Sequence, residues 1–192
     1  MVGYLLARDG GLEGLNGPLY NFIFAGNGVF IEAENEILRA RVRISPCAIR
    51  GLTALAEEVT LKKGLVPGWM LNVMLGAFLS DLEREQFIAV TWEGCYRLVK
   101  PPQIGEAGGV TYVPVEGAVL EVHSHGRLAP FFSATDDRDE QGLKVYMVVG
   151  QMHNGLPSLA LRVGVYGYYA PLNWAEVFDT LPGGIQVQGD FQ

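Results

Sequence analysis

The chain of 192 residues has few of the residue types from which several common sites are built. Its only two cysteines, Cys47 and Cys95, lie far apart without CxxC spacing, which argues against a thiolate zinc site and a disulfide framework. We therefore expect two reduced, partly buried thiols in a cytoplasmic protein. No apolar run is long enough to cross a bilayer, and residues 1–9 lack the cationic and apolar regions of a signal peptide. These absences predict no membrane partner.

Positive charge is also scarce. The sequence has 14 Lys and Arg against 21 Asp and Glu, a formal net charge of −7, and no basic cluster with interleaved aromatic residues. Binding to phosphates requires a basic surface, so we expect nucleic acid not to be the main partner. The hydrophobic content of 49% with 18% charged residues predicts a compact globular protein, either one domain or one domain with an appendage. The sequence does not predict an oligomeric state.

Histidine occurs only three times, and two of the three histidines stand in His123-Ser124-His125. With Ser133 and Asp136 they form the pattern His-x-His-x7-Ser-x2-Asp. Two histidines separated by one residue on a strand point to the same side, so both can bind one ion. A catalytic zinc has three protein ligands and an exchangeable water. We therefore predict a hydrolytic Zn²⁺ site with His123, His125 and Asp136 as ligands and Ser133 donating a hydrogen bond into it.

The segments around this pattern favour an active site. The apolar residues 117–122 predict a strand that ends at the first histidine, and Gly126 begins a loop. Ser133 is a typical N-cap, followed by Asp136 and Asp137 in the first turn of a predicted helix. Strand, loop and capped helix together bring the predicted ligands to one place.

The rest of the chain predicts an α+β fold in two parts. Residues 1–44 read as an N-terminal β appendage, with a hairpin around Gly26-Asn27-Gly28, and residues 45–192 form the main domain, on which the appendage packs. Two helices are predicted, one after Ser45-Pro46 with an apolar face up to Val59 and one from Pro67 to Leu82. The further predicted segments are strands at 87–92, 96–99, 110–113, 117–123, 143–149 and 158–166, a loop at 100–109, and a short helix or extended arm at 171–178.

The His-x-His-x7-Ser-x2-Asp pattern resembles the signature of the JAMM (MPN+, Mov34/JAB) metalloproteases, and the resemblance covers roughly residues 45 to 170. Within that family, residues 123–137 with the preceding strand 87–92 are most similar to the members found in bacterial PRTRC gene systems. The resemblance implies a mixed β-sheet flanked by helices and a Zn²⁺-dependent hydrolysis of peptide or isopeptide bonds. It also implies a ubiquitin-like protein, or its conjugates, as the partner.

The family pattern also includes a glutamate upstream, which acts as the general base. This glutamate lies on a strand that follows a long helix. Glu85 is the acid at the corresponding junction, but the spacing found in many members places Gln86 at that position, opposite Ala89. A one-residue slip reverses the face to which a strand side chain points. Our hypothesis is that Glu85 is the general base, with Glu83 and Glu121 as less favoured alternatives.

The sequence is also compatible with other functions and folds. An MPN-like scaffold could bind partners without catalysis, and a cupin barrel could complete a metal site with His153, although the predicted helices count against a barrel. A zinc deaminase is disfavoured because its PCxxC cysteines are missing. Of the neighbouring acids, Asp137 is a weak second ligand candidate, and Asp139 and Glu140 are expected to be solvated or to stabilise the helix N-terminus.

Overall fold

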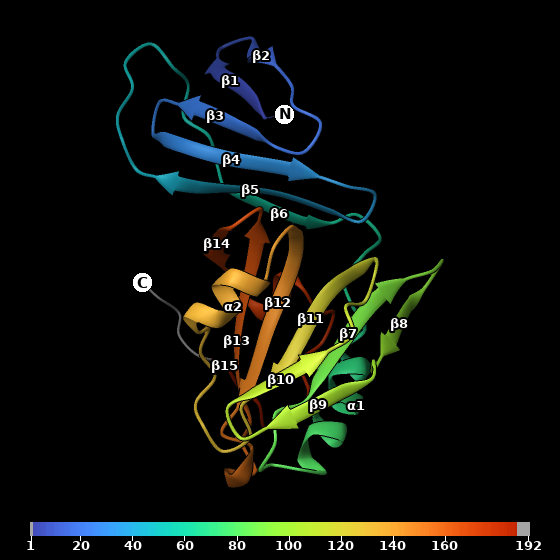
Figure 1. Ribbon diagram of the computed structural model, residues 1–192. Coiled ribbons are helices and arrows are strands. Elements are labelled where there is room, and N and C mark those ends of the chain that lie inside the picture. Colours follow the sequence, from blue (N-terminus) through green and yellow to red (C-terminus); the bar gives the residue numbers. More distant parts are fainter. Residues whose placement is uncertain (1, 188–192) are drawn as a thin grey trace.

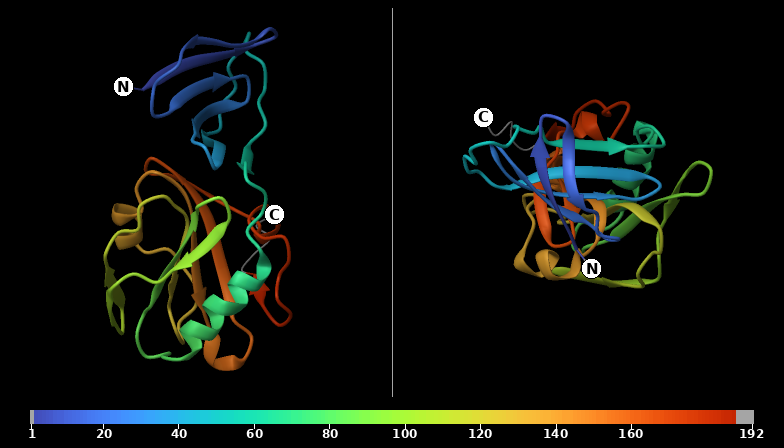
Figure 2. Two further views of the ribbon diagram at one scale, coloured as in Figure 1. Left: turned by 90° about the vertical axis from the view of Figure 1, so that its right-hand side faces the viewer. Right: turned by 90° about the horizontal axis from the view of Figure 1, so that it is seen from above.

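The computed structural model describes residues 2–187 and shows two large β-sheets, one above the other (Figures 1 and 2), and a small two-stranded sheet. The first sheet contains the N-terminal strands, and the second contains the predicted site (Figure 1). The combination is a mixed α+β fold that is mostly β, consistent with a JAB-like fold. Within residues 2–187, no helix has the length and hydropathy needed to cross a membrane.

The first sheet has six strands in the order β2-β1-β3-β4-β5-β6, with β1 and β3 parallel and the other pairs antiparallel. The predicted hairpin around Asn27 and the strand after it are confirmed. The sheet continues past residue 44, because β6 adds to its edge. Its strands are β1 (Gly3–Arg8), β2 (Gly11–Leu15), β3 (Asn21–Ala25), β4 (Gly28–Glu34), β5 (Leu38–Ser45) and β6 (Glu58–Leu61).

The prediction of a helix after Ser45-Pro46 is wrong. Residues 46–57 are irregular, and Val59 lies in β6. The segment instead pairs with the first sheet: Gly26 N donates to Thr53 O at 2.8 Å, and the Asn27 side chain donates to Leu55 O and accepts from Leu55 N. These long-range bonds satisfy the backbone, so an apolar spacing that fits a helix does not produce one.

The second sheet has the order β14-β13-β12-β11-β7-β8, with β15 added beside β13. The pairs β11–β12 and β13–β15 are parallel, and the others are antiparallel. The strand predictions for this half are confirmed apart from their exact ends. The strands are β7 (Phe87–Trp92), β8 (Tyr96–Val99), β11 (Ala118–Ser124), β12 (Leu143–Gly150), β13 (Ser158–Val165), β14 (Tyr168–Pro171) and β15 (Gln186–Val187).

The helices and one hairpin cover this sheet. The helix predicted from Pro67 is α1 (Gly68–Leu79), which ends before the predicted Leu82. The predicted loop 100–109 instead contributes β9 (Gln103–Glu106), which forms a two-stranded sheet with β10 (Gly109–Tyr112). The short helices are α2 (Ala134–Asp139), η1 (Met152–Asn154) and η2 (Trp174–Glu176), and the last of these lies within the predicted arm 171–178.

The two faces of the second sheet pack against different elements. Met74 and Phe78 of α1 pack with Ile88 and Val122 in a core that also includes Ile31 of the first sheet. On the opposite face, the hairpin β9–β10 and α2 cover the strands (Figure 1). The predicted site lies on this second face, whereas α1 supports the sheet from behind. Both cysteines are exposed, not partly buried as predicted, because Cys47 lies in the irregular segment and Cys95 in the β7–β8 turn.

Candidate metal centre

His123 and His125 stand where β11 ends, and both line one cavity. The two Nε2 atoms are 3.2 Å apart. The other ring nitrogen of His125, Nδ1, is 3.1 Å from Ala129 O, a carbonyl that can only accept a hydrogen bond. The proton of His125 therefore belongs on Nδ1, which leaves the lone pair of Nε2 directed at His123 and available to a metal.

Burial keeps both imidazoles in the form that binds metals. Burial lowers the pKa of His123 to about 4, and the nearby Asp136 opposes this shift only partly. Burial also lowers the pKa of His125. Neutral imidazole is the metal-binding form, so both side chains are prepared for ligation at neutral pH.

Ser133 and Asp136 are joined by the N-terminal cap of α2. Ser133 Oγ accepts from Asp136 N at 3.2 Å, and Ser133 N donates to Asp136 Oδ2 at 2.6 Å, which completes a capping box and confirms the predicted N-cap. The other carboxylate oxygen, Asp136 Oδ1, lies 3.7 Å from His123 Nε2. The cap thus orients Asp136 towards the histidines, and the Ser133 hydroxyl hydrogen stays free to donate.

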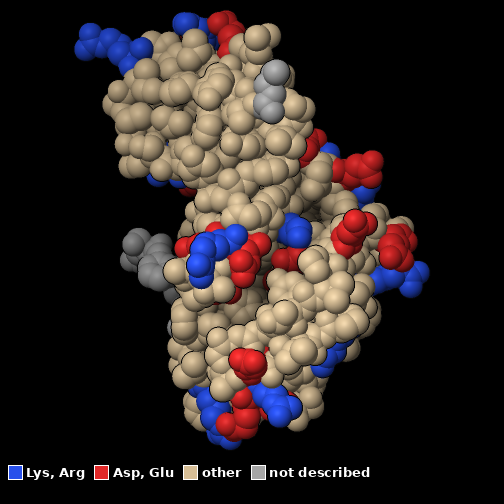
Figure 3. All heavy atoms as spheres, in the orientation of Figure 1, with Lys and Arg blue, Asp and Glu red and all other residues tan. Residues whose placement is uncertain are grey.

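A cavity of about 310 Å³ opens over these groups. Figure 3 shows a hollow below the first sheet with acidic side chains around it. One wall is the hairpin β9–β10 with Tyr112, which stacks on Phe87, and another contains Leu128 and Phe131. The predicted ligands therefore line a cavity that has apolar and aromatic walls and several acidic side chains.

Glu85 lines the cavity, whereas Gln86 does not. Phe87 pairs with His123 across β7 and β11, and side chains two residues apart share a face, so Glu85 lies on the histidine side. The side chain of Gln86 points the other way, donating to Phe78 O and Asp81 O at the end of α1. Burial, with a further contribution from the negative Asp136, raises the pKa of Glu85 to about 7.

The remaining predicted candidates have other partners. Glu83 is exposed and pairs with Arg127 at 2.8 Å, outside the cavity. Glu121 lines the cavity but is held by Lys144 at 2.5 Å. His153 is exposed on η1 and does not line the cavity, which removes the support for a cupin-like three-histidine site.

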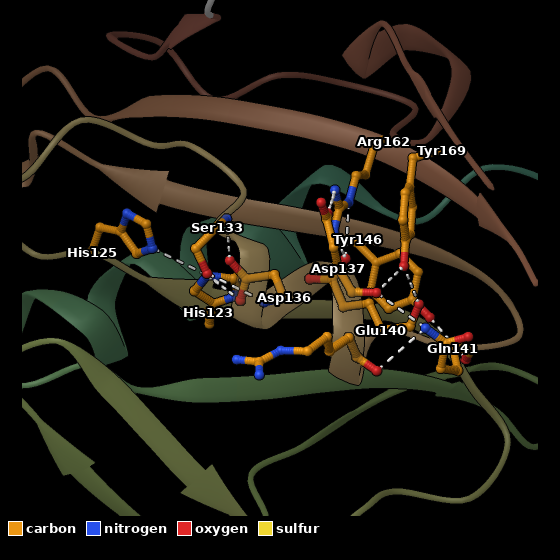
Figure 4. A network of polar contacts seen from close by, with 11 residues as sticks. His123, His125, Ser133, Asp136, Asp137, Glu140, Gln141, Tyr146, Arg162 and Tyr169 are labelled. Carbon is orange, nitrogen blue, oxygen red and sulfur yellow. Dashed lines mark hydrogen bonds and ion pairs between the residues drawn. The ribbon is translucent and has the colours of Figure 1, made fainter. Parts of the chain in front are cut away.

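Sequence reasoning missed the roles of Glu140 and Arg162. Glu140 was expected to be solvated or to stabilise a helix N-terminus, but it is buried at the C-cap of α2. Ligand atoms of His123, Asp136 and Glu140 all lie within 4.8 Å of one another. Arg162 binds Glu140 and Asp137 (Figure 4). The available signal was Arg162 itself, the only charged residue in the apolar strand 158–165, because a buried guanidinium requires partners.

The donor set fits a metal ion of the zinc type. Two ligands at zinc bond lengths of about 2.0–2.1 Å in tetrahedral geometry are about 3.3 Å apart. The observed separations of 3.2 Å between the histidine nitrogens and 3.7 Å to Asp136 Oδ1 are close to this value. Ligand atoms of His123, Asp136 and Glu140 also lie mutually within 4.8 Å, so the positions allow His125 or Glu140 beside His123 and Asp136.

Comparison with protein families identifies a match over residues 80–162, to the prokaryotic homologs of the JAB domain. The matched stretch includes Glu85, both cavity histidines, the Ser133–Asp136 cap and Arg162. No curated protein matches the chain. The family match, together with the geometry of the site, supports the JAB/MPN family for the part of the chain that carries the candidate metal centre.

Proposed function

We propose that this protein is a zinc-dependent hydrolase of peptide or isopeptide bonds that acts on the C-terminus of a ubiquitin-like protein or on its conjugates. The observation that carries the proposal is the convergence of His123, His125 and Asp136 in the lining of a cavity that also contains Ser133 and Glu85. Members of the matched family are often hydrolytic, and the match therefore supports the same class of reaction.

The residues of the cavity have separate roles in this proposal. His123, His125 and Asp136 would hold Zn²⁺, which when bound makes water acidic and polarises the scissile carbonyl. Glu85, with a pKa near 7, is suited to accept a proton from the attacking water and to return it to the leaving amine. Ser133 can donate its hydroxyl hydrogen to the oxygen of the carbonyl as negative charge develops there.

The hairpin β9–β10 supports recognition of an extended chain. The outer edge of β10 pairs with no other strand in the described part of the chain, and Gly108, Gly109 and Val110 line the cavity. The two glycines have open space where a side chain would stand. An extended C-terminal tail with small residues could add to this edge through main-chain hydrogen bonds.

We further propose a relationship to protein A of the bacterial PRTRC system, which the sequence around the two histidines resembles, together with a cytoplasmic location. The expectation of a cytoplasmic protein rests on two isolated cysteines, Cys47 and Cys95.

Metal analysis tests the first half of the proposal. After removal of metal and reloading with Zn²⁺, the wild type should contain about one zinc per chain. His123→Ala and His125→Ala should lose it, whereas the exposed His153→Ala should keep it as the matched control. A wild type without stoichiometric zinc would contradict the metal site.

Cleavage of a ubiquitin-like fusion protein tests the second half. Glu85→Gln should keep zinc and lose about 10²- to 10⁴-fold in rate, because only proton transfer is removed. Glu83→Gln, an exposed acid two residues away, is the matched control and should cleave normally. A wild type that binds zinc and the ubiquitin-like protein but cleaves nothing would favour the scaffold function instead.

A further inference from the structure

The helix that carries Asp136 has almost no apolar support. α2 is six residues long, and none of its residues is buried. A helix of this length is unstable by itself, because nucleation costs more than a few hydrogen bonds recover. Polar contacts must therefore determine where α2 lies.

Arg162 of β13 supplies the main contacts (Figure 4). Its side chain is 9% exposed, and its Nε and Nη2 both donate to Glu140 Oε2, at 2.9 and 2.6 Å. Its Nη1 donates to Asp137 Oδ1 at 2.6 Å. The guanidinium also lies between two aromatic rings, 3.9 Å from the centroid of Phe132 and 3.8 Å from that of Tyr169. The guanidinium is thereby fixed in both position and orientation.

Tyr169 of β14 binds the same end of the helix. Its hydroxyl lies 2.8 Å from both Asp137 O and Glu140 O. The last carbonyls of a helix have no partner within the helix, and the single hydroxyl hydrogen of Tyr169 can be donated to either of these two. Ser133 caps the N-terminal end of α2, and Arg162 with Tyr169 anchors the C-terminal end to β13 and β14.

This anchor also brings two carboxylates to the metal centre. Glu140 and Asp136 both offer an oxygen within 4.8 Å of the His123 ligand nitrogen. Two adjacent carboxylates repel each other unless a cation compensates, and Arg162 is the cation bound to Glu140. Without Arg162, both the position of α2 and the pairing of these acids would change.

We infer that Arg162 is a positioning residue for the metal centre: by holding Glu140 and Asp137 it fixes α2 so that Asp136 and Glu140 face His123. The inference rests on the proposed metal site and adds a residue that is not among those lining the cavity. It predicts that metal affinity depends on the shape of the Arg162 side chain and not only on its charge.

Titration of the metal-free protein with Co²⁺, followed by its visible absorption, tests this inference. Arg162→Lys keeps the positive charge but lacks the planar guanidinium that bonds both Glu140 and Asp137 while it stacks on the two rings. We expect it to bind Co²⁺ about 10- to 100-fold more weakly than the wild type, with an altered spectrum. Arg138→Lys, on the exposed side of the same helix, is the matched control and should bind like the wild type.

A second variant covers the case in which Arg162→Lys does not fold. Tyr169→Phe keeps the stacked ring and removes only the hydroxyl, and we expect about 5-fold weaker binding. Unchanged Co²⁺ affinity and spectrum in the folded variants would overturn the inference while leaving the proposed function intact. A wild type that binds no stoichiometric Co²⁺ would instead overturn the proposed function and this inference together.

Discussion

The pKa of Glu85 predicts a measurable effect on the stability of the metal-free protein. Burial raises this pKa from its ordinary value of 4.5 to about 7. The folded state therefore holds the proton more tightly than the unfolded state does. The stability that Glu85 contributes is fully present below about pH 4.5 and is lost as the pH rises towards 7. At pH 8, the ionised carboxylate destabilises the metal-free fold, and Glu85→Gln should relieve this cost.

The size of the effect follows from the same values. The full pKa difference corresponds to about 3 kcal/mol, and because the side chain is partly exposed, solvent screening reduces the expected effect to about 1 kcal/mol. Urea unfolding of the metal-free wild type and Glu85→Gln at pH 8 and pH 4.5 measures it. Other shifted groups, such as His123 and Glu140, are present in both proteins and cancel in the comparison.

We expect Glu85→Gln to be more stable than the wild type by about 1 kcal/mol at pH 8 and nearly equal at pH 4.5. Added Zn²⁺ should reduce or reverse the difference at pH 8, because a cation in the site favours the ionised carboxylate. Glu83→Gln, at an exposed acid that pairs with Arg127 outside the cavity, is the matched control. The same stability difference for Glu85→Gln at both pH values would refute the reasoning.

Two further predictions concern the cap and the first sheet. Ser133→Ala removes the acceptor for Asp136 N and should cost about 1 kcal/mol in urea unfolding and at least about 10²-fold in cleavage rate; a normal rate would contradict the role at the carbonyl. A fragment of residues 1–44 should not fold cooperatively, because it lacks β6 and because Ile31 packs in a core shared with the second sheet; a sharp thermal transition by circular dichroism would contradict this.

The parts of the site that could be predicted from the sequence are those that depend on residues close together in the chain. The strand ending at His123 and the cap at Ser133 follow from local periodicity and from capping preferences, and the structure has both. The choice between Glu85 and Gln86 could not be made in this way, because the pairing of Phe87 with His123 decides which face each side chain occupies.

The failures of sequence reasoning have a common physical cause. The helix predicted after Ser45-Pro46 has the right apolar spacing, but its backbone finds partners in the first sheet instead. The role of Glu140 depends on Arg162, which is 22 residues away. In both cases a contact distant in sequence outweighs a local preference, and no local pattern contains the identity of the distant partner.

Asp136 links the stability of α2 to the metal centre in a way that determines which variants are informative. Its Oδ2 accepts the hydrogen bond that closes the capping box, and its Oδ1 faces His123. Removing Asp136 would therefore remove a cap and a ligand together, and lost metal binding could not be assigned to either one. His123→Ala leaves the cap in place, whereas Arg162→Lys leaves all proposed ligands in place, so these two variants separate ligation from positioning. Because metal would bind both β11 and α2, its binding free energy should also stabilise the attachment of the helix to the sheet.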